Sequence, residues 1–569
     1  MPGCKRLNFR QRFLSLFRPP QPATTSSILY REEPDQSSDD RASPPRTSTD
    51  IDSVRTSSYS TALGEENDQY SDDRLFQDEI EPKLRSHVFN MMPIRVIKVD
   101  KASFKLVERS ALFSLTKDKA LTLWKNRDAS QLLANTVNRI VAESTRYAIL
   151  SHTWHKDGEL CLQEIQGQGT EHDLAVCDSD PEKMKKLKHF CRIARDEYHV
   201  EFVWADMVCI DKSSSTELDE SIRAMFMWYK NAYTCVAYLA GTQSLADVVR
   251  DPWFTRGWTL QELLAPKHMK FYSVEWKQLT TSDNDKRDCD KTRALLEAIV
   301  EATPISKDDI LDFSPSAKRG VAKKMIWVAN RQTTRAEDKA YCMMGIFHVS
   351  FPIAYGEGEE RAFFRLFKEI LQVTDNPDIL NWAGEPINLE IHPSRMIPSS
   401  AHCYLPSCKI TRGNHETHER HRDLSEREVE PLTLTSIGMR IRLLVVPATL
   451  LSLRPSTTIP SVYTARFQCA LTNRQVGLKF MRPQLPDDIS HGLESFRYAF
   501  GVFNIPHAND YFIPHHCLAI LLYEIDDYRF QRTQKLATRG VIAFATTEYH
   551  RRLTALPDLW GAGVRTMYL

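Results

Sequence analysis

Residues 202–240, FVWADMVCIDKSSSTELDESIRAMFMWYKNAYTCVAYLA, decide the predicted fold. Two short apolar runs, FVWAD (202–206) and TCVAYLA (234–240), flank a segment of mixed polar and apolar residues, 214–232. Apolar residues recur in that segment at three- and four-residue steps, which is typical of an amphipathic helix: Leu218, Ile222, Met225 and Tyr229. A strand, a helix and a strand in this order predict a crossover connection between two parallel strands.

The same alternation continues on both sides of this unit. YAILS (147–151) and MKFYS (269–273) predict two further strands, and residues 181–198 predict another amphipathic helix. A short helix is expected at roughly 253–265. Short apolar strands separated by amphipathic helices are typical of a parallel sheet covered on both faces. We therefore expect a small doubly wound α/β core over about 147–275.

The rest of the chain divides into three parts. Residues 1–88 are rich in Ser, Pro, Asp and Thr, a composition that buries too little apolar surface to offset the entropy of ordering, so we expect a disordered low-complexity tail. Residues 316–372 have a helical pattern and predict a helical extension of the core. Residues 376–569 contain short apolar runs separated by turn residues and predict a separate β-rich, sandwich-like domain.

The first 18 residues leave two interpretations open. Five basic side chains interleave with Leu and Phe there, which fits a basic amphipathic helix on a membrane surface with Cys4 as an acylation site. The same residues also fit a basic disordered terminus.

Composition excludes several classes of protein. Lys and Arg together number 74, as do Asp and Glu, so no net charge favours a nucleic acid partner or an anionic membrane. No run of about 18 apolar residues is present, so we expect no transmembrane segment. The 12 cysteines are scattered and no signal peptide precedes them, which predicts a reducing, cytoplasmic location.

The search for established chemical motifs is mostly negative. His415, His418 and His421 have three-residue spacing, but their segment is highly charged and lacks the HExxH order, so we expect no metal site. Cys403 and Cys408 are too isolated for a four-ligand zinc site. Phosphate-binding loops of the P-loop and Rossmann types are absent from the sequence, as is a G-x-S-x-G elbow.

Polar residues gather where the predicted parallel strands end. Ligands of doubly wound sheets bind at the carboxyl ends of the strands, where Ser151, His152, Thr153, Trp154 and Asp206 are expected. RGWTLQELLAP (256–266) follows the third strand and places Glu262 four residues after Trp258, on the same helix face.

Glu262 is the candidate for acid chemistry. A carboxyl beside an indole and out of water has a raised pKa, which is how enzymes that cleave glycosidic bonds obtain an acid. The alternative is that Glu262 forms a salt bridge to Arg256 or lies at a solvated edge of the helix.

Five stretches together resemble the fungal heterokaryon incompatibility (HET) domain over residues 92–372. They are YAILSHTW (147–154), VWADMVCIDKSSSTELDESIRAMFMWYKNAYTCVAYL (203–239), WFTRGWTLQELLAP (253–266), RQTTRAEDKAYCMMGIF (331–347) and PIAYGEGEERAFFRL (352–366). The resemblance implies a role in non-self recognition, a form of innate immunity that ends in the regulated death of fused cells. It also implies a core related to the Toll/interleukin-1 receptor (TIR) domain, so the expected fold class is α/β with a TIR/flavodoxin-like parallel sheet.

The likeness to TIR domains extends to one short run. RGWTLQELLAP is similar to the segment Ser-x-Trp-Cys-Leu-x-Glu-Leu, which supplies the catalytic glutamate of TIR domains that cleave NAD; Trp258, Leu260, Glu262 and Leu263 match it. Thr259 stands where Cys is usual.

That match implies an NAD(P)+ glycohydrolase in which Glu262 stabilises the oxocarbenium-like transition state. The predicted substrate-binding residues are Ser151 and Asp206 on ribose hydroxyls, Trp154 or Trp258 on a ring, and Arg256. NAD is then a substrate and no cofactor is expected. The alternative is a non-catalytic signalling module that self-associates and responds to a partner incompatibility or receptor protein.

Overall fold

The computed structural model describes most of the chain from residue 72 to residue 569. Within that range the residues outside the description are 129–131, 156–157, 177–179, 375, 383, 389, 408–430, 456, 458–461, 470–474, 482–496, 503–510, 514–515, 527–528, 533–541, 546–550 and 554–562. Most of the predicted tail, the basic terminus with Cys4, and His415, His418 and His421 therefore lie outside the described residues. None of the described helices is both long and apolar enough to cross a membrane.

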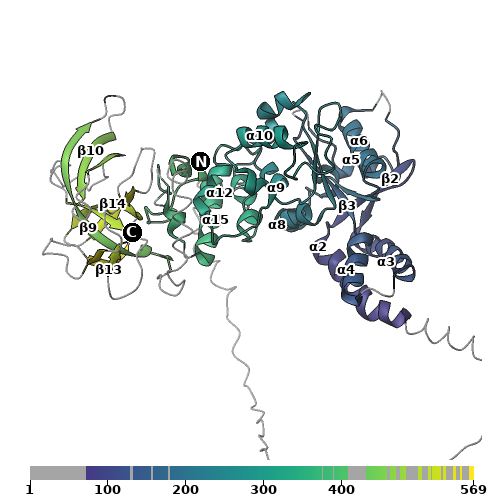
Figure 1. The fold of residues 1–569 in the computed structure, drawn as a ribbon, viewed down its shortest axis with the longest axis horizontal. Helices are drawn as coiled ribbons and strands as arrows, with labels where there is room; N and C mark the ends of the chain where they lie inside the picture. The colour runs from purple at the N-terminus through teal and green to yellow at the C-terminus, as the bar shows by residue number, and fades with distance from the viewer. Residues whose placement is uncertain are drawn as a thin grey trace, which may run out of the picture. The chain divides into compact units, whose positions relative to one another are not determined.

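A seven-stranded sheet lies at the centre of the predicted core (Figure 1). Its strands are β1 (Arg95–Val99), β2 (Ser103–Glu108), β3 (Tyr147–His152), β4 (His172–Asp173), β5 (Phe202–Trp204), β6 (Thr234–Tyr238) and β7 (Met269–Tyr272). Their order across the sheet is β4-β2-β1-β5-β3-β6-β7. The four predicted strands, β5, β3, β6 and β7, pair in parallel, as expected from the crossover helices between them.

The prediction of a purely parallel sheet is wrong at one edge. β1 pairs antiparallel with β5 and with β2, and β2 pairs antiparallel with β4. The antiparallel pair β1–β2 is a local hairpin: residues 95–108 turn back over the short turn at 100–102, and the two strands of a hairpin are antiparallel. The TIR/flavodoxin-like assignment stays a prediction.

The strand order places a switch point at β3. The next parallel strand in the chain, β5, lies on one side of β3, and β6 lies on the other. In doubly wound sheets, ligands bind outside the carboxyl ends of the strands at such a switch point. The helices in these connections include α6 (Glu182–Asp196), α7 (Asp206–Cys209) and α8 (Ser215–Asn231). α8 begins as predicted, with the backbone N–H of Glu217 donating to the Ser214 hydroxyl at 3.3 Å.

The predicted tail ends earlier than residue 88. A π-helical turn, η1 (Phe76–Ile80), leads into α2 (Glu81–Met91), which packs against α3 (Arg109–Lys125) and α4 (Leu133–Ser144). The buried residues Phe76, Ile80, Leu84 and Val88 are spaced by four and form one face. These apolar residues recur with a helical period, but the residues around them are polar. A prediction from composition alone therefore assigned residues 72–88 to the disordered tail instead of to a helix.

The predicted helical extension is confirmed. Its helices, with those that lead into it, are α10 (Arg293–Ala302), α11 (Lys307–Leu311), α12 (Val321–Ala329), α13 (Asp338–Tyr341), α14 (Met344–Phe347) and α15 (Glu359–Val373). Figure 1 shows this group beside α8 and α9 (Thr259–Leu264). Gly345 allows the contact between α14 and α8, because a Cβ there would lie 2.2 Å from the Cβ of Phe226.

The β-rich C-terminal region is also confirmed, although its first strand begins at residue 433. Between α15 and that strand the described regular elements are the short 3-10 helices η4 (Pro377–Leu380) and η5 (Ala401–Ser407). The strands that form the described sheets are β8 (Thr433–Thr435), β9 (Gly438–Pro455), β10 (Val462–Cys469), β11 (Gln475–Met481), β12 (Tyr498–Val502), β13 (Tyr511–Ile513), β14 (His516–Asp526), β15 (Arg529–Arg532), β16 (Ile542–Ala545), β17 (Arg551–Leu553) and β18 (Gly563–Tyr568). They form one nine-stranded sheet and the separate pair β13–β17.

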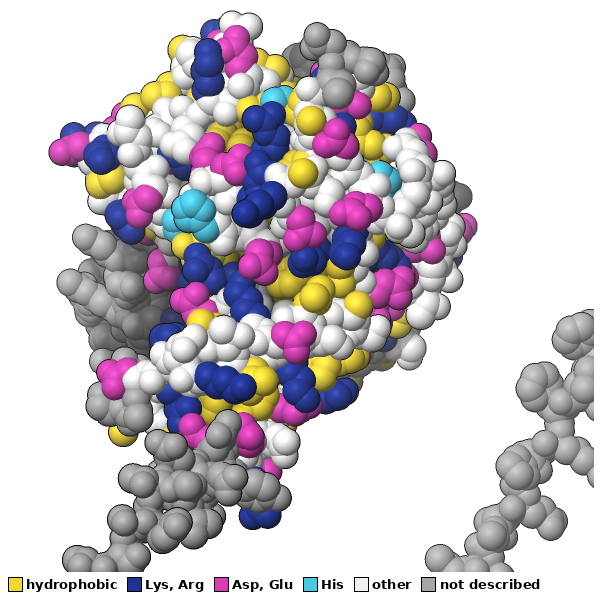
Figure 2. All heavy atoms as spheres, turned by 90° about the vertical axis from the view of Figure 1, so that its right-hand side faces the viewer, with side chains coloured by type: hydrophobic (Ala, Val, Ile, Leu, Met, Phe, Trp, Pro, Cys, Tyr) yellow, Lys and Arg dark blue, Asp and Glu magenta, His cyan; other side chains and the backbone are white. Residues whose placement is uncertain are grey.

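Charges of both signs are intermingled on the surface. Figure 2 shows one face on which basic and acidic side chains alternate without an extended area of one sign. Surface ion pairs of this kind include Lys98–Asp100 at 2.7 Å and Arg109–Glu220 at 3.0 Å.

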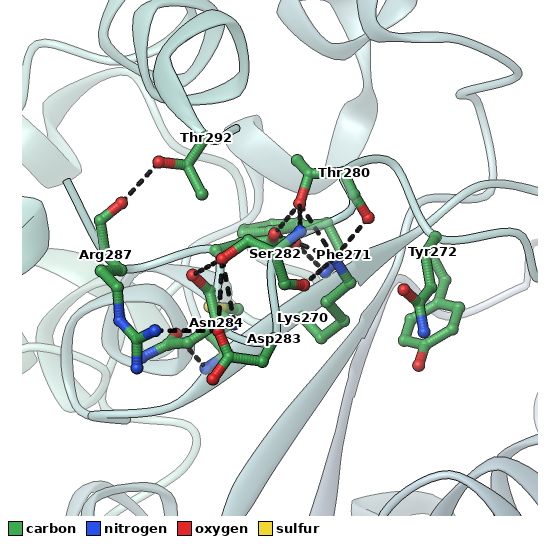
Figure 3. Close-up of polar contacts among 12 residues, drawn as sticks. Lys270, Phe271, Tyr272, Thr280, Ser282, Asp283, Asn284, Arg287 and Thr292 are labelled. Atoms are coloured by element: carbon green, nitrogen blue, oxygen red, sulfur yellow. Dashed lines mark hydrogen bonds and ion pairs between the residues drawn. The ribbon is translucent and has the colours of Figure 1, made fainter. Parts of the chain in front are cut away.

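One ion pair of the core is completely buried. Lys270 on β7 lies 3.1 Å from Asp285, and its ammonium also donates to the carbonyl oxygens of Thr280 and Ser282 at 2.7 and 2.8 Å. Figure 3 shows Thr280 and Ser282 near Lys270. The Asp285 carboxylate in turn accepts the backbone N–H of Phe271 at 2.8 Å. The pair thus fixes the loop after β7 to the edge of the sheet.

Lys270→Met should lower the free energy of unfolding by about 3–5 kcal/mol, because it leaves the Asp285 charge buried without its counter-ion. The matched control is Lys277→Met on the same loop. Lys277 pairs with Glu275, and their side chains are 77% and 61% exposed, so no measurable change is expected. Urea unfolding of both variants is the measurement, and equal small losses would show that the buried pair does not hold the loop.

Candidate functional site

The candidate site lies at the carboxyl ends of β3 and β6, where α9 packs against the sheet edge. Asp251 holds the connection from β6 to α9 in place. One of its carboxylate oxygens accepts the backbone N–H of Gly241 at 2.9 Å and the hydroxyl of Thr242 at 2.8 Å. The other accepts the backbone N–H of Trp253 at 2.9 Å and caps the 3-10 helix η3 (Pro252–Thr255). The predicted single helix at 253–265 is therefore two short helices, η3 and α9.

The C-terminal end of α9 is held by a buried lysine. Lys286 donates to the carbonyl oxygens of Leu263, Leu264 and Pro266 at 3.0, 3.2 and 2.8 Å. These are carbonyls left without partners at the end of the helix, and a cation also complements the helix dipole there. Burial lowers the pKa of Lys286 to about 8, opposed by the negative charges of Cys235 and Asp312 when these are ionised.

Glu262 contacts Ser151 directly. The Ser151 hydroxyl donates to Oε2 of Glu262 at 2.5 Å and accepts the indole N–H of Trp253 at 2.9 Å. Glu262 is only 7% exposed, and Ser151 is fully buried. The strand β3 and the helix α9, which are 111 residues apart at this contact, are thus joined through one carboxyl group.

Burial raises the pKa of the Glu262 carboxyl to about 8, and the negative charge of Asp206 acts in the same direction. The hydrogen bond from Ser151, the neighbouring Tyr229 hydroxyl and the charge of Arg256 oppose this shift. The carboxyl is therefore mostly neutral at pH 7. The predicted alternative of a salt bridge is not seen: no ion pair among the described residues joins Glu262 to Arg256.

Asp206 organises a second group of side chains at the same edge. Its Oδ1 is 3.0 Å from Nε2 of His152, and its Oδ2 accepts the indole N–H of Trp154 at 2.9 Å. Lys212 lies 3.8 Å from Oδ2 and 3.8 Å above the Trp154 ring. Burial disfavours the ionised form of Asp206, but the charge of Lys212 and the hydrogen bonds from His152 and Trp154 outweigh it and hold the pKa well below its usual range. The site therefore combines a neutral carboxyl with a permanently ionised one.

Four of the six predicted site residues lie together at this edge. Ser151 and Glu262 form one pair, and Trp154 and Asp206 form the other. The remaining two face the helical extension: Trp258 donates its indole N–H to Asp338 at 3.1 Å, and Arg256 donates to the Thr334 hydroxyl at 3.4 Å.

Several residues of the site were not singled out from the sequence. Tyr229 was assigned only to the buried face of its helix, yet its hydroxyl donates to the Leu150 carbonyl at 2.8 Å and borders Glu262. Trp253, Lys212 and Glu159 were not predicted. The ring nitrogen Nδ1 of His152 is buried without a hydrogen-bond partner, 4.0 Å from Glu159. His152 itself was expected at this edge, because it stands at the end of an apolar strand.

No group of three or more metal-ligating side chains is arranged to bind a metal in the part of the chain that the structure describes. The buried carboxyls and hydroxyls are instead suited to hydrogen bonding and to charge stabilisation.

Comparison with known proteins identifies the family. Residues 147–249 match the family model "Heterokaryon incompatibility protein (HET)". The vegetative incompatibility protein HET-E-1 of Podospora anserina is 39% identical over 236 residues, which cover 39% of this chain and 16% of that protein. The match identifies residues 147–249 of the chain as a HET domain.

The HET match covers only part of the candidate site. Residues 147–249 include β3, β5, α8 and β6, and with them Ser151, Asp206 and Tyr229, but they end before Glu262. The chain spans less than a fifth of the length of the Podospora relative. No solved structure matches the chain.

Glu262→Gln should remove a pH dependence from the stability of the HET domain protein. The pKa of Glu262 is about 8 in the folded state and 4.5 in a model compound, so between these values the folded state keeps a proton that the unfolded state has released. Its contribution is complete below about pH 4.5 and is lost as the pH rises through about 8.

The wild type should therefore lose stability relative to Glu262→Gln between roughly pH 5 and 8 in urea unfolding. Glu275→Gln is the control, because Glu275 is 61% exposed and should keep the wild-type slope. Parallel curves for wild type and Glu262→Gln would mean that Glu262 is ionised throughout this range.

Proposed function

We propose that this HET domain protein acts in heterokaryon incompatibility, where it triggers the regulated death of fused cells, and that it does so by NAD(P)+ glycohydrolysis at Glu262. The family match and the name of the Podospora relative support the role in incompatibility. The sequence similarity of RGWTLQELLAP to NAD-cleaving TIR domains supports the choice of reaction.

The observation that carries the proposed activity is the Glu262–Ser151 pair at the carboxyl end of β3. Cleavage of the bond between nicotinamide and ribose leaves positive charge on the ribose ring, and water then attacks the same carbon to give ADP-ribose, nicotinamide and a proton. A carboxylate buried next to that ring stabilises the charge more strongly than it would in water. Ser151, which donates to Glu262 at 2.5 Å, fixes the carboxyl in one orientation.

The ionisation of Glu262 suits a cationic substrate. The carboxyl is mostly neutral at pH 7, because burial raises its pKa to about 8. The nicotinamide ring of NAD+ is positively charged, so its arrival favours the ionised carboxylate that the reaction needs.

Trp154 supplies the aromatic surface. It is 44% exposed, with Lys212 above the ring and its indole N–H fixed by Asp206. A fixed, partly exposed indole is suited to stacking against a planar base. The two oxygens of Asp206 already have protein partners, so in this arrangement Asp206 positions Trp154 and His152.

The alternative is a non-catalytic signalling module that self-associates or binds a partner protein. One observation favours it: Glu262 is buried among hydrogen-bond partners from the protein itself, which a purely structural carboxyl also requires. The two functions differ in what Glu262→Gln does.

The test is release of nicotinamide from NAD+ by the purified full chain. Glu262→Gln should reduce the rate by about 10²–10³-fold, because it removes the charge that stabilises the transition state but keeps the shape of the side chain. Glu275→Gln, at an exposed glutamate, should match the wild type. Equal rates in wild type and Glu262→Gln, or no NAD+ consumption by the wild type, would remove the glycohydrolase and leave the signalling module.

A further inference from the structure

Residues of the helical extension hold the first turn of α9 in place. The segment after α12, 331–334, runs alongside residues 255–257 in a parallel bridge. The backbone N–H of Gln332 donates to the Thr255 carbonyl at 2.7 Å, and the N–H of Gly257 donates to the Gln332 carbonyl at 2.9 Å. A Cβ at Gly257 would lie 2.4 Å from Cγ2 of Thr333, so only glycine allows this close approach.

Arg331 extends this contact to the first turn of α9. Its Nη1 donates to the Arg256 carbonyl at 2.7 Å and to the Thr259 hydroxyl at 3.1 Å, while Nε donates to the Trp327 carbonyl at 3.1 Å. Arg331 is 4% exposed, and its Nη2 is buried without a hydrogen-bond partner. Thr259 and Glu262 are three residues apart in α9 and therefore lie on neighbouring positions of one helix face.

The guanidinium also acts through its charge. Burial lowers the pKa of Arg331 to about 10, while the negative charges of Cys342 and Glu262, when these are ionised, act in the opposite direction. Arg331 is thus a cation at neutral pH. The attraction between two opposite charges is mutual. Because ionised Glu262 stabilises the Arg331 cation, the Arg331 cation also favours the ionised form of Glu262.

We propose that Arg331 is a positioning residue for Glu262: from the helical extension it fixes the first turn of α9, and its buried charge favours the carboxylate form of Glu262. The unpaired Nη2 fits this role, because a buried guanidinium donor without an acceptor is costly until a negative charge forms nearby. The proposed effects of Arg331 on the position and charge of Glu262 do not require the NAD reaction. Its consequence for catalysis rests on the proposed function.

Other groups around Glu262 also set its ionisation. The titratable or charged groups around α9 are Asp206, Tyr229, Cys235, Arg256, Lys286 and Arg331. Asp206 opposes ionisation of Glu262, and Arg256 favours it. Removal of Arg331 therefore leaves one fewer cation against the same negative charge.

The test compares Arg331→Gln and Arg331→Lys in the full chain, each with and without Glu262→Gln. The difference in unfolding free energy with and without Glu262→Gln, followed against pH, reports the titration of Glu262 in each background. Arg331→Gln should move the high-pH end of that titration upward, because it removes a positive charge. Arg335→Gln is the control: Arg335 stacks on Tyr355 at 3.9 Å and should leave the titration of Glu262 unchanged.

Arg331→Lys separates position from charge. Lysine keeps the charge but lacks the planar fork that reaches two acceptors at once, so the titration should stay near that of the wild type. Amide hydrogen exchange in the first turn of α9 should be faster by roughly 10-fold, since each 1.4 kcal/mol of lost local stability corresponds to that factor. If Arg331→Gln does not fold, the hydrogen exchange rate measured in Arg331→Lys tests the proposal by itself.

An unchanged titration in folded Arg331→Gln, or wild-type exchange in Arg331→Lys, would overturn the proposal. These readouts do not depend on activity. A wild type that does not consume NAD+ but shows both shifts contradicts the proposed glycohydrolase and leaves the role of Arg331 in place.

Discussion

The hydrogen bond between Ser151 and Glu262 is the contact on which the arrangement of the site depends. A carboxyl with 7% exposure is compatible with a stable fold only if it has hydrogen-bond partners or is neutral, and Glu262 satisfies both conditions. The contact requires β3 to end at a small hydroxyl residue and α9 to be held firmly. Lys286 at one end of the helix and Arg331 at the other provide that hold.

The two carboxyls of the site have opposite ionisation because their surroundings differ. Glu262 faces the hydroxyl groups of Ser151 and Tyr229, so burial dominates its pKa, whereas Asp206 has Lys212 and His152 as direct partners. A neutral acid and a fixed anion at one sheet edge form a site that a cationic ligand would reorganise electrostatically. The helical extension takes part in this arrangement, since it supplies Arg331 and the acceptors for Trp258 and Arg256.

The sequence predicted the elements whose pattern is local. The parallel strands, α8 and the helices of the extension follow from apolar spacing, and topology then brought Ser151 and Glu262 to the same edge. The hairpin β1–β2 and the helix α2 were missed because their apolar residues lie within polar segments. The directions of Trp258 and Arg256 were not predictable either. They depend on a segment more than 70 residues later, 332–338, and spacing within α9 contains no information about it.

The most direct measurement of the central claim, that Glu262 is a buried neutral carboxyl, is an infrared difference spectrum between the full wild-type chain and Glu262→Gln. At about pH 6.5 the difference should contain the carbonyl stretch of a protonated carboxylic acid, and this band should disappear above about pH 9, since the pKa is about 8. A difference spectrum that contains only carboxylate bands at about pH 6.5 would contradict the account.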